Sequence, residues 1–357
     1  MTQTMKSLAL ALLVLLSTAG AAPAADFPER LSHEELSRTR GFDRTHLPLL
    51  ERLPGPGKEA MTEALLTRFA AAGGSITTAG AFTQDVSESR VAVVSDAGWA
   101  LKIHADGTRV SYVNFAALEA NPELHVPVAQ RPTESELEAL GRSFIAKQLT
   151  GLVATSAEEE LVPFYTEFAI YGAMAVDGSG QVEPEKVAAA TVVFTRAVGG
   201  VPVVGPGSKV AVTFTNDKQP VAFDVDWAQY EVRGDEQELL PLSAVLARSR
   251  VLADMAKHAE PAEVEHLECG YYDPGARRKD PLAPIQAACF VQAKQRRVVD
   301  EAAQAANPAD GHVLVALAEA IPAAGEVAPD GDWPEAQALA GQPVVQGGEV
   351  GETPPAR

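Results

Sequence analysis

The chain has 357 residues, of which 46% are hydrophobic and 22% are charged, so it can bury a core and wholesale disorder is not expected. Its 48 acidic residues outnumber 29 Lys and Arg and give a formal net charge of −19. Such a surface repels phosphate backbones and anionic lipid, which argues against nucleic acid or a membrane surface as a partner. The length allows about two or three modules of ordinary size.

Residues 1–24 have the features of a cleaved secretory signal peptide. Lys6 gives the start of the chain a positive charge, residues 8–16 form an apolar run, and Ala22 and Ala24 place small side chains before the expected cleavage point. The apolar run is shorter than the roughly 20 residues that cross a bilayer, and no later segment is apolar enough to do so. We therefore expect a secreted or periplasmic protein with no membrane span.

Residues 25–57 are polar and rich in Pro and Gly, which predicts an N-terminal segment that acts as a linker. A first module is expected over residues 58–130. Residues 58–72 carry an apolar stripe that ends before two glycines, so they predict a helix. Strands are predicted after it at residues 90–95, 99–104 and 109–114.

A second module is expected over residues 131–235. Thr133 and Glu136 form a T-x-x-E capping box ahead of a helix that runs to about residue 149. Strands are predicted after this helix at residues 161–176, 186–197, 208–215 and 220–227.

A third module is expected over residues 236–324, and it contains both cysteines of the chain. Its predicted elements are a helix at residues 242–258 and strands at residues 266–272, 285–292 and 312–321. An antiparallel pairing of the first two strands would place Cys269 opposite Cys289, close enough for a disulfide. Because an oxidising compartment favours such a bond, we predict a disulfide rather than a metal site.

The three cycles of a helix followed by strands predict an α+β fold class. We expect three small modules, each with a helix packed on an antiparallel sheet. Residues 325–357 are rich in Gly and Pro and predict a disordered tail, with Trp333 as its aromatic residue.

The usual catalytic signatures are absent from the sequence. It contains no G-x-S-x-G, Walker A, H-E-x-x-H or G-x-G-x-x-G motif, and the seven histidines have no metal-ligand spacing. Asp224 and Asp226 share one face of a predicted strand, where a carboxylate pair can bind a cation or act in acid/base chemistry, although a polar strand face is the simpler interpretation. We therefore predict no catalytic residue, no metal and no cofactor.

One basic loop stands out on the acidic chain. Arg277, Arg278 and Lys279 lie between the two cysteines, and a disulfide-held basic loop can contact an acidic patch on another protein. A solvated loop tip is the alternative interpretation. We name these three residues as the predicted partner-binding site.

The most distinctive stretch of the chain starts at Val192 and reads VVFTRAVGGVPVVGPGSKVAVTFTNDKQPVAFDVDW. Its G-V-P-V-V-G segment, the following strand, the Asn216–Asp217 turn and the last strand resemble the PepSY and thermolysin-propeptide type of module. The resemblance covers about residues 133–230. Modules of this type inhibit or chaperone secreted peptidases, or have regulatory roles in the cell envelope, and they share no catalytic residues.

The resemblance implies a non-catalytic protein that restrains or regulates a secreted peptidase or another envelope protein. Because a further small cycle, and not a peptidase domain, follows residue 230, we expect action on a separate protein partner. Two alternatives stay open on the sequence alone. One is a structural or surface-associated envelope protein, and the other is a secreted hydrolase whose site is assembled from dispersed carboxylates and histidines.

Overall fold

The structure is a computed structural model, and it describes residues 44–72, 76–119, 125–153, 155–171, 185–258, 262–275, 280, 282–298, 312–324 and 337–339. The predicted signal peptide at residues 1–24, the basic loop residues Arg277, Arg278 and Lys279, and Trp333 lie outside the described residues. The same holds for most of the predicted tail, of which residues 337–339 are described.

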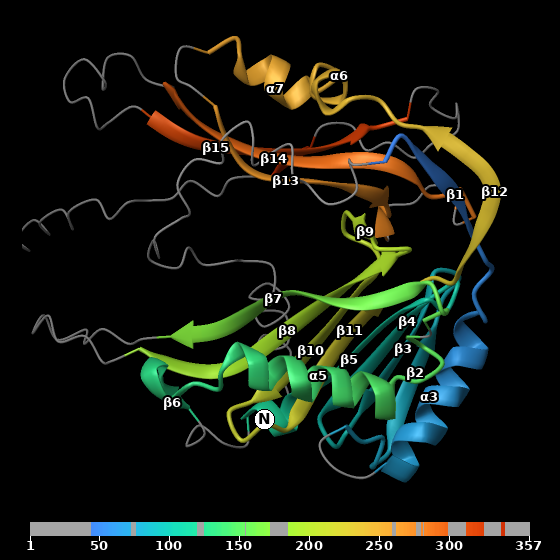
Figure 1. Ribbon diagram of the computed structural model, residues 1–357. Helices are drawn as coiled ribbons and strands as arrows, with labels where there is room; N and C mark the ends of the chain where they lie inside the picture. The colour runs from blue at the N-terminus through green and yellow to red at the C-terminus, as the bar shows by residue number, and fades with distance from the viewer. Residues whose placement is uncertain are drawn as a thin grey trace, which may run out of the picture. The chain divides into compact units, whose positions relative to one another are not determined.

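The centre of the fold is a long antiparallel arrangement that we name the main sheet (Figure 1). Its strands lie in the order β2-β3-β4-β5-β11-β10-β8, and β7 pairs along the whole length of β8. Their bounds are β2 Phe82–Val86, β3 Arg90–Ser95, β4 Trp99–His104, β5 Arg109–Asn114, β11 Pro220–Asp226, β10 Lys209–Thr215, β8 Lys186–Val198 and β7 Glu159–Tyr171.

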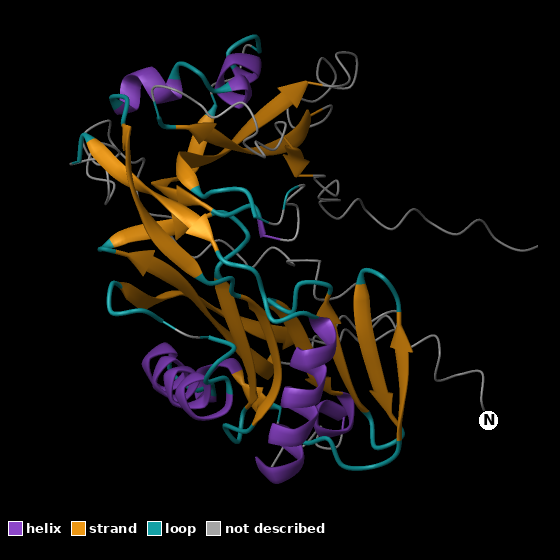
Figure 2. Ribbon diagram, turned by 90° about the vertical axis from the view of Figure 1, so that its right-hand side faces the viewer, coloured by secondary structure: helices purple, strands orange, loops and turns teal. Residues whose placement is uncertain are grey.

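Two long helices, α3 (Lys58–Ala72) and α5 (Glu134–Gln148), pack on one face of the main sheet (Figures 1 and 2). Thr133 is the N-cap of α5, and its hydroxyl accepts a hydrogen bond from the Glu136 N–H, as the predicted capping box requires. Both helices place apolar side chains against the same strands, so one aromatic-rich core lies between helices and sheet. Phe69 of α3 packs edge-on against Tyr112 and Phe223 at its centre.

The main sheet is built from two halves with the same order of elements. Helix α3 precedes β2 to β5, and helix α5 precedes β7, β8, β10 and β11. The last strand of each half meets the other at the centre, where β5 and β11 pair antiparallel with Ser111 opposite Asp224. Because β5 pairs with β11, neither strand is left at an open edge, and β2 and β7 are the outermost strands of the main sheet.

A second group of strands, which we name the disulfide sheet, carries both cysteines. It consists of β13 (Glu263–Tyr272), β14 (Gln286–Val298), β15 (His312–Pro322) and β16 (Gln337–Leu339), paired antiparallel in that order. Strand β9 (Val201–Val204) pairs antiparallel with β8 and parallel with β13, so it joins the disulfide sheet to the main sheet. Two short helices, α6 (Leu242–Leu246) and α7 (Arg250–Met255), contact β15.

The remaining elements are short, or they are strands whose pairing partner is distant in the sequence. Strand β1 (His46–Arg52) pairs with β12 (Tyr230–Glu238) in a separate two-stranded sheet. Strand β6 (Val126–Pro127) pairs with β8, the 3-10 helix η2 (Val128–Gln130) follows it, and α4 (Phe115–Glu119) follows β5. The sequence analysis predicted none of these elements, because none has a clear periodicity of its own.

The prediction of three small helix-on-sheet modules is wrong. The first two predicted cycles pair through β5 and β11 and share one sheet and one core, and β9 extends the hydrogen-bonded order to fourteen strands in the described part of the chain. The third predicted helix, residues 242–258, is also wrong as one element. Helix α6 ends at Leu246, and Ser249 caps the start of α7, since its hydroxyl accepts from the Leu252 N–H.

Gly141 tests how closely α5 approaches the main sheet. A Cβ atom at this position would lie 2.7 Å from the Phe194 ring and 2.8 Å from Val192. Gly141→Ala is therefore expected to lower the free energy of unfolding by about 1–3 kcal/mol through overpacking, although alanine is the better helix former. Urea unfolding would measure it, with the exposed Ala146→Gly on the same helix as the propensity control. A stabilised Gly141→Ala variant would contradict the close packing.

Candidate functional site

The face of the main sheet opposite α3 and α5, which we name the outer face, is the candidate functional site. Side chains alternate along each strand, so every second residue points away from the helices. On β4 the residues Trp99, Leu101 and Ile103 are buried in the core, while Ala100, Lys102 and His104 are half-buried on the outer face. Strands β5, β10 and β11 show the same alternation over most of their length. The outer face therefore offers a broad surface of small and polar side chains.

Four basic residues of the outer face come together on three neighbouring strands. We name Arg90, Lys102, His104 and Arg109 the basic cluster. The register places His104 of β4 between Arg90 of β3 and Arg109 of β5. Lys102 is two residues from His104 on the same face, and so lies diagonally between the two arginines.

Burial and repulsion among the cations both act on the basic cluster. Partial burial, together with the charges of Arg90 and Arg109, lowers the pKa of Lys102. Partial burial and the charges of Arg109 and Lys102 likewise lower the pKa of His104, while Asp224 and Asp106 act in the opposite direction. Since both values fall, the carboxylates do not balance desolvation and the repulsion among the cations. An anion that reaches this surface would relieve that repulsion.

Asp224 and Asp226 lie on the outer face, next to the basic cluster. The Ser111 hydroxyl donates a hydrogen bond to the Asp224 carboxylate, which engages one of its oxygens. Asp226 is opposite Arg109 in the register and is 6% exposed, so it is not on a solvated strand face. Within the described residues no group of three or more His, Cys, Asp or Glu side chains is placed to hold a metal ion. The two carboxylates therefore form the acidic border of the basic cluster.

Lys209 extends the outer face toward β8. Its ammonium donates to the Thr195 hydroxyl at 2.7 Å and lies 4.7 Å from the centre of the Phe164 ring. Burial lowers the pKa of Lys209 to about 8, and the charges of Glu268 and Asp273 act against that change. At neutral pH the ammonium thus stays charged at a cost in desolvation.

Lys209→Met is expected to raise the free energy of unfolding at pH 7 by about 2 kcal/mol, because it removes a partly desolvated charge. The folded-state pKa is about 8 against 10.5 for a free lysine, so between these values the unfolded chain binds more protons and wild-type stability rises with pH. The advantage of the variant should therefore shrink from pH 8 to pH 10.5. Urea unfolding across this range would show it, with the exposed Lys257→Met as control. A difference that is independent of pH would contradict the desolvated charge.

Arg196 of β8 is a buried cation of the main sheet. The Arg196 guanidinium lies 3.9 Å from the centre of the Trp227 ring and 4.6 Å from that of Tyr230. Its Nη1 atom is 3.0 Å from Oε1 of Glu159, and both side chains are almost fully buried. Burial is the main influence on Arg196 and lowers its pKa. Within the described residues none of its guanidinium nitrogens has a hydrogen-bond partner, so an ion pair and two aromatic faces hold this charge in place.

A buried carboxylate connects the main sheet to the end of β13. Asp273 is fully buried and accepts hydrogen bonds from the Tyr230 hydroxyl at 2.6 Å and the Ser208 hydroxyl at 2.8 Å. Its other oxygen accepts from the Gly275 N–H at 2.9 Å. Ser208 and Asp273 are both inaccessible to a substrate, so this serine–carboxylate pair joins structural elements and does not form a nucleophilic site.

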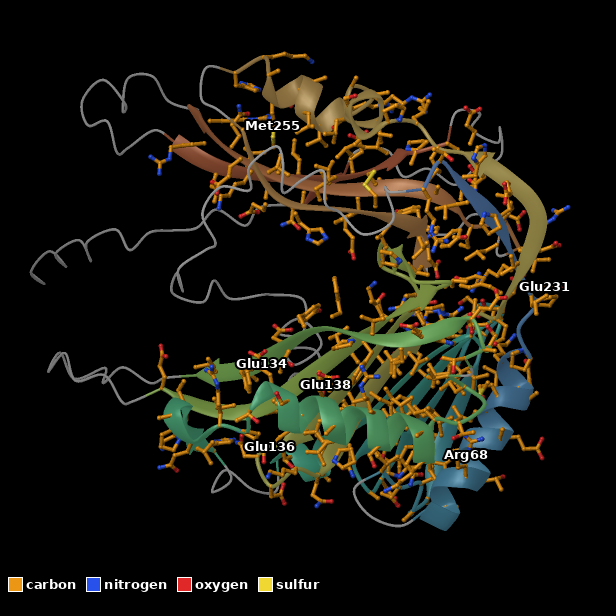
Figure 3. The ribbon with its side chains drawn as sticks, viewed as in Figure 1. Arg68, Glu134, Glu136, Glu138, Glu231 and Met255 are labelled. Carbon is orange, nitrogen blue, oxygen red and sulfur yellow. A yellow bond between two sulfur atoms is a disulfide. The ribbon has the colours of Figure 1, made fainter. Side chains whose placement is uncertain are left out.

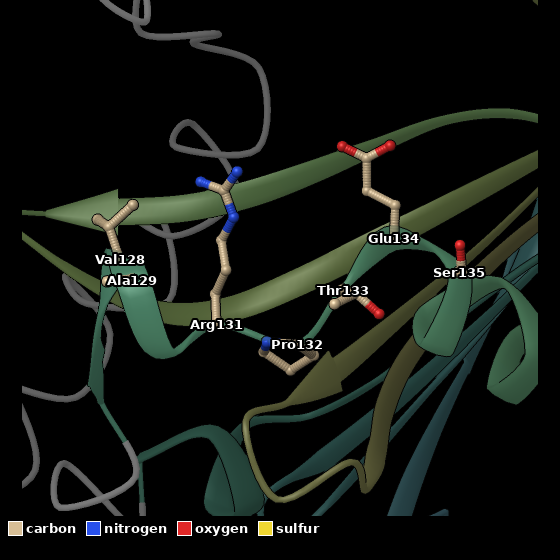
Figure 4. Close-up of a pocket in the computed structure, with 7 residues that line it drawn as sticks. All are labelled: Val128, Ala129, Arg131, Pro132, Thr133, Glu134 and Ser135. Carbon is tan, nitrogen blue, oxygen red and sulfur yellow. The ribbon is translucent and has the colours of Figure 1, made fainter.

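A shallow hollow of about 560 Å³ lies at the N-terminus of α5 (Figure 4). The Arg131 and Glu134 side chains point in the same direction at its mouth (Figure 4). The helix N-terminus is already occupied by its own capping box, and Arg131 stacks 4.5 Å from the centre of the Phe168 ring. These contacts already engage the Glu136 N–H and the Arg131 guanidinium, and we assign no ligand to this hollow.

The residues that the sequence predicted as sites have different outcomes. Cys269 lies directly opposite Cys289 in the β13–β14 register and is joined to it by a disulfide (Figure 3). Arg277, Arg278 and Lys279 lie outside the described residues, so their proposed contact stays a prediction. The basic cluster was missed, although a signal for it was present: each of three consecutive predicted strands carries a basic residue on the same face, and the middle strand carries two.

Comparison with known proteins gives no family for this chain. No protein-family model matches the sequence, and no curated protein matches it. Among solved structures, it is similar to the crystal structure of an uncharacterized protein from Eubacterium rectale, with 11% sequence identity and a TM-score of 0.49. That similarity covers 79% of this chain and 85% of the other.

The outer face combines a broad surface with a cationic centre and an acidic border. In the part of the chain that the structure describes, every helix is too short or too polar to cross a bilayer.

Proposed function

We propose that the mature chain is a non-catalytic protein of the periplasm or the extracellular space that binds a protein partner through its outer face. The partner class that fits the PepSY-like stretch is a secreted peptidase or another envelope protein, which the binding would restrain or regulate. One observation carries the proposal: the main sheet is covered by α3 and α5 on one face, while the other face presents half-buried polar side chains around a charged centre.

Broad antiparallel sheets with one packed and one open face are suited to such binding. The rigid backbone holds the outer side chains in fixed positions, so little ordering accompanies association. Next to the basic cluster, three neighbouring strands place short apolar side chains directly opposite one another, namely Ala100, Val113 and Ala222. A partner would contact these side chains and the charged residues together.

Export is part of the proposal. The apolar run at residues 8–16 and the small residues before position 25 support removal of a signal peptide, and the disulfide between Cys269 and Cys289 is compatible with an oxidising compartment. Protein recovered from the envelope or culture fluid is expected to begin at Ala25, which N-terminal sequencing would show. An intact N-terminus on exported protein would contradict this processing.

The test of the binding surface uses a neutral steric block. The chain from Ala25 onward would be immobilised and exposed to the secreted and envelope fractions of its own organism. Ala222→Tyr places a bulky uncharged side chain in the middle of the outer face, and Ala64→Tyr makes the same change on the exposed side of α3. We expect a stoichiometric partner to be retained by the wild type and by Ala64→Tyr but to be lost from Ala222→Tyr.

Two results would contradict the proposal. Equal retention by both variants would place the partner elsewhere on the chain. Retention of bulk wall polymer alone would favour the alternative of a structural envelope protein. Thermal unfolding of each variant would show that a loss of binding is not a loss of fold.

A further inference from the structure

The basic cluster is a local reversal of the charge of the whole chain. The chain carries a formal net charge of −19, yet three strands of its outer face present Arg90, Lys102, His104 and Arg109 together. The charges of Arg90 and Arg109 lower the pKa of Lys102, so these three cations repel one another in the free protein. Asp224 offsets that repulsion only in part, and a bound anion would relieve it further.

We propose that the basic cluster binds an acidic, extended segment of the partner protein, whose carboxylates pair with Arg90, Lys102 and Arg109. This inference rests on the proposed function and specifies the chemistry of its partner. Its first support is charge complementarity, because the cluster is the place on the outer face where positive charges gather.

The second support is the type of cation. Arg90 and Arg109 carry planar guanidinium groups, which can pair with a carboxylate through two parallel hydrogen bonds.

The spacing of the cluster fits an extended chain. Arg90 and Arg109 lie on either side of His104, two strand spacings or about 10 Å apart. Side chains at alternate positions of an extended chain face the same side and are about 7 Å apart. An extended segment with carboxylates at every second position would therefore present all of them to Arg90, Lys102 and Arg109.

A nucleic acid is a weaker candidate for the same surface. A polynucleotide carries regular charge over a long span and would meet the acidic residues around the cluster, including Asp224 and Asp226. A short acidic peptide segment is confined to the cluster itself. The test below includes an oligonucleotide so that the two are separated.

The experiment measures binding of a fluorescein-labelled decaglutamate peptide to the chain from Ala25 onward by fluorescence anisotropy at low salt. The variant Arg90→Gln with Lys102→Gln removes two charges from the cluster. The matched control, Arg250→Gln with Lys257→Gln, removes the same residue types and the same charge from the exposed surface of α7 and its C-terminus. We expect the cluster variant to weaken binding about tenfold or more and the control to change it less than about twofold.

Several outcomes would overturn the inference. They are no binding of decaglutamate, equal weakening by both double variants, and binding of a ten-nucleotide single-stranded DNA as tight as that of decaglutamate. The single variant Arg90→Gln, at an exposed position, gives the same readout if the double variant unfolds. It should weaken binding of decaglutamate in the same direction.

The tests of the inference and of the proposed function can fail separately. Ala222→Tyr adds bulk without charge, and the cluster variant removes charge without adding bulk. If the partner is lost from Ala222→Tyr but decaglutamate does not bind, the outer face is the binding surface and the acidic chemistry is wrong.

Discussion

Glu159→Gln is expected to lower the free energy of unfolding by about 3–5 kcal/mol, because it leaves the buried Arg196 without its counter-charge. The two side chains are 0% and 4% exposed, and their closest atoms are 3.0 Å apart. The rings of Trp227 and Tyr230 would still contact the guanidinium, but they supply partial and not full negative charge. Urea unfolding at pH 7 measures the loss.

The control for this pair is the double variant Glu159→Gln with Arg196→Met. Removing both charges should recover much of the lost stability, because a methionine stacks on Trp227 and Tyr230 without the desolvation of a charge. A Glu159→Gln variant as stable as the wild type would show that the aromatic faces alone hold Arg196. A double variant less stable than both single variants would contradict the ion pair as the reason.

Replacing both cysteines by alanine is expected to lower the free energy of unfolding by about 3 kcal/mol, the chain-entropy value for a loop of this size. The bond joins directly opposed residues of β13 and β14, 20 positions apart in the chain, and both side chains are buried. Urea unfolding of the wild type and of the Cys269→Ala, Cys289→Ala variant measures the difference.

Intact mass is the direct check on this bond. The oxidised protein should be lighter than the reduced protein by two hydrogens. An unchanged mass after reduction would mean that the pair is not bonded in the isolated protein. Reduced wild type should then unfold at the same urea concentration as the untreated protein.

Local structure could be predicted from the sequence where the signals are local. The helix over residues 58–72, the capping box of Thr133 and Glu136, and the strands at residues 90–95, 99–104 and 109–114 agree with the structure. Each depends on neighbouring residues, through apolar periodicity or side-chain capping. The pairing of Cys269 with Cys289 follows in the same way from two strands joined by one loop.

The fold could not be predicted because it depends on which strand edges meet. The pairing of β5 with β11 joins residues about a hundred positions apart, and nothing in the sequence of either strand indicates its partner. The same is true of β1 with β12 and of β9 with β13. Counting helix and strand cycles therefore gave three modules, where the first two share one sheet.

The candidate site could not be predicted from the sequence for the same reason. Asp224 and Asp226 were noticed because they are close in sequence, whereas the basic cluster needs the register of three strands to bring Arg90 beside Arg109. The buried ion pair was missed because Glu159 is within a run of three acids whose side chains gave no sign of burial. Long-range pairing thus determines both the core and the surface that we propose for binding.

The central claim is that the outer face binds a protein partner, and site-specific photo-crosslinking in the native organism tests it most directly. A photoreactive amino acid at Val94, which is exposed on the outer face, would be compared with the same amino acid at the exposed Ala64 of α3. We predict one crosslinked protein from position 94 and none from position 64. Crosslinks from position 64 alone, or from neither position, would contradict the claim.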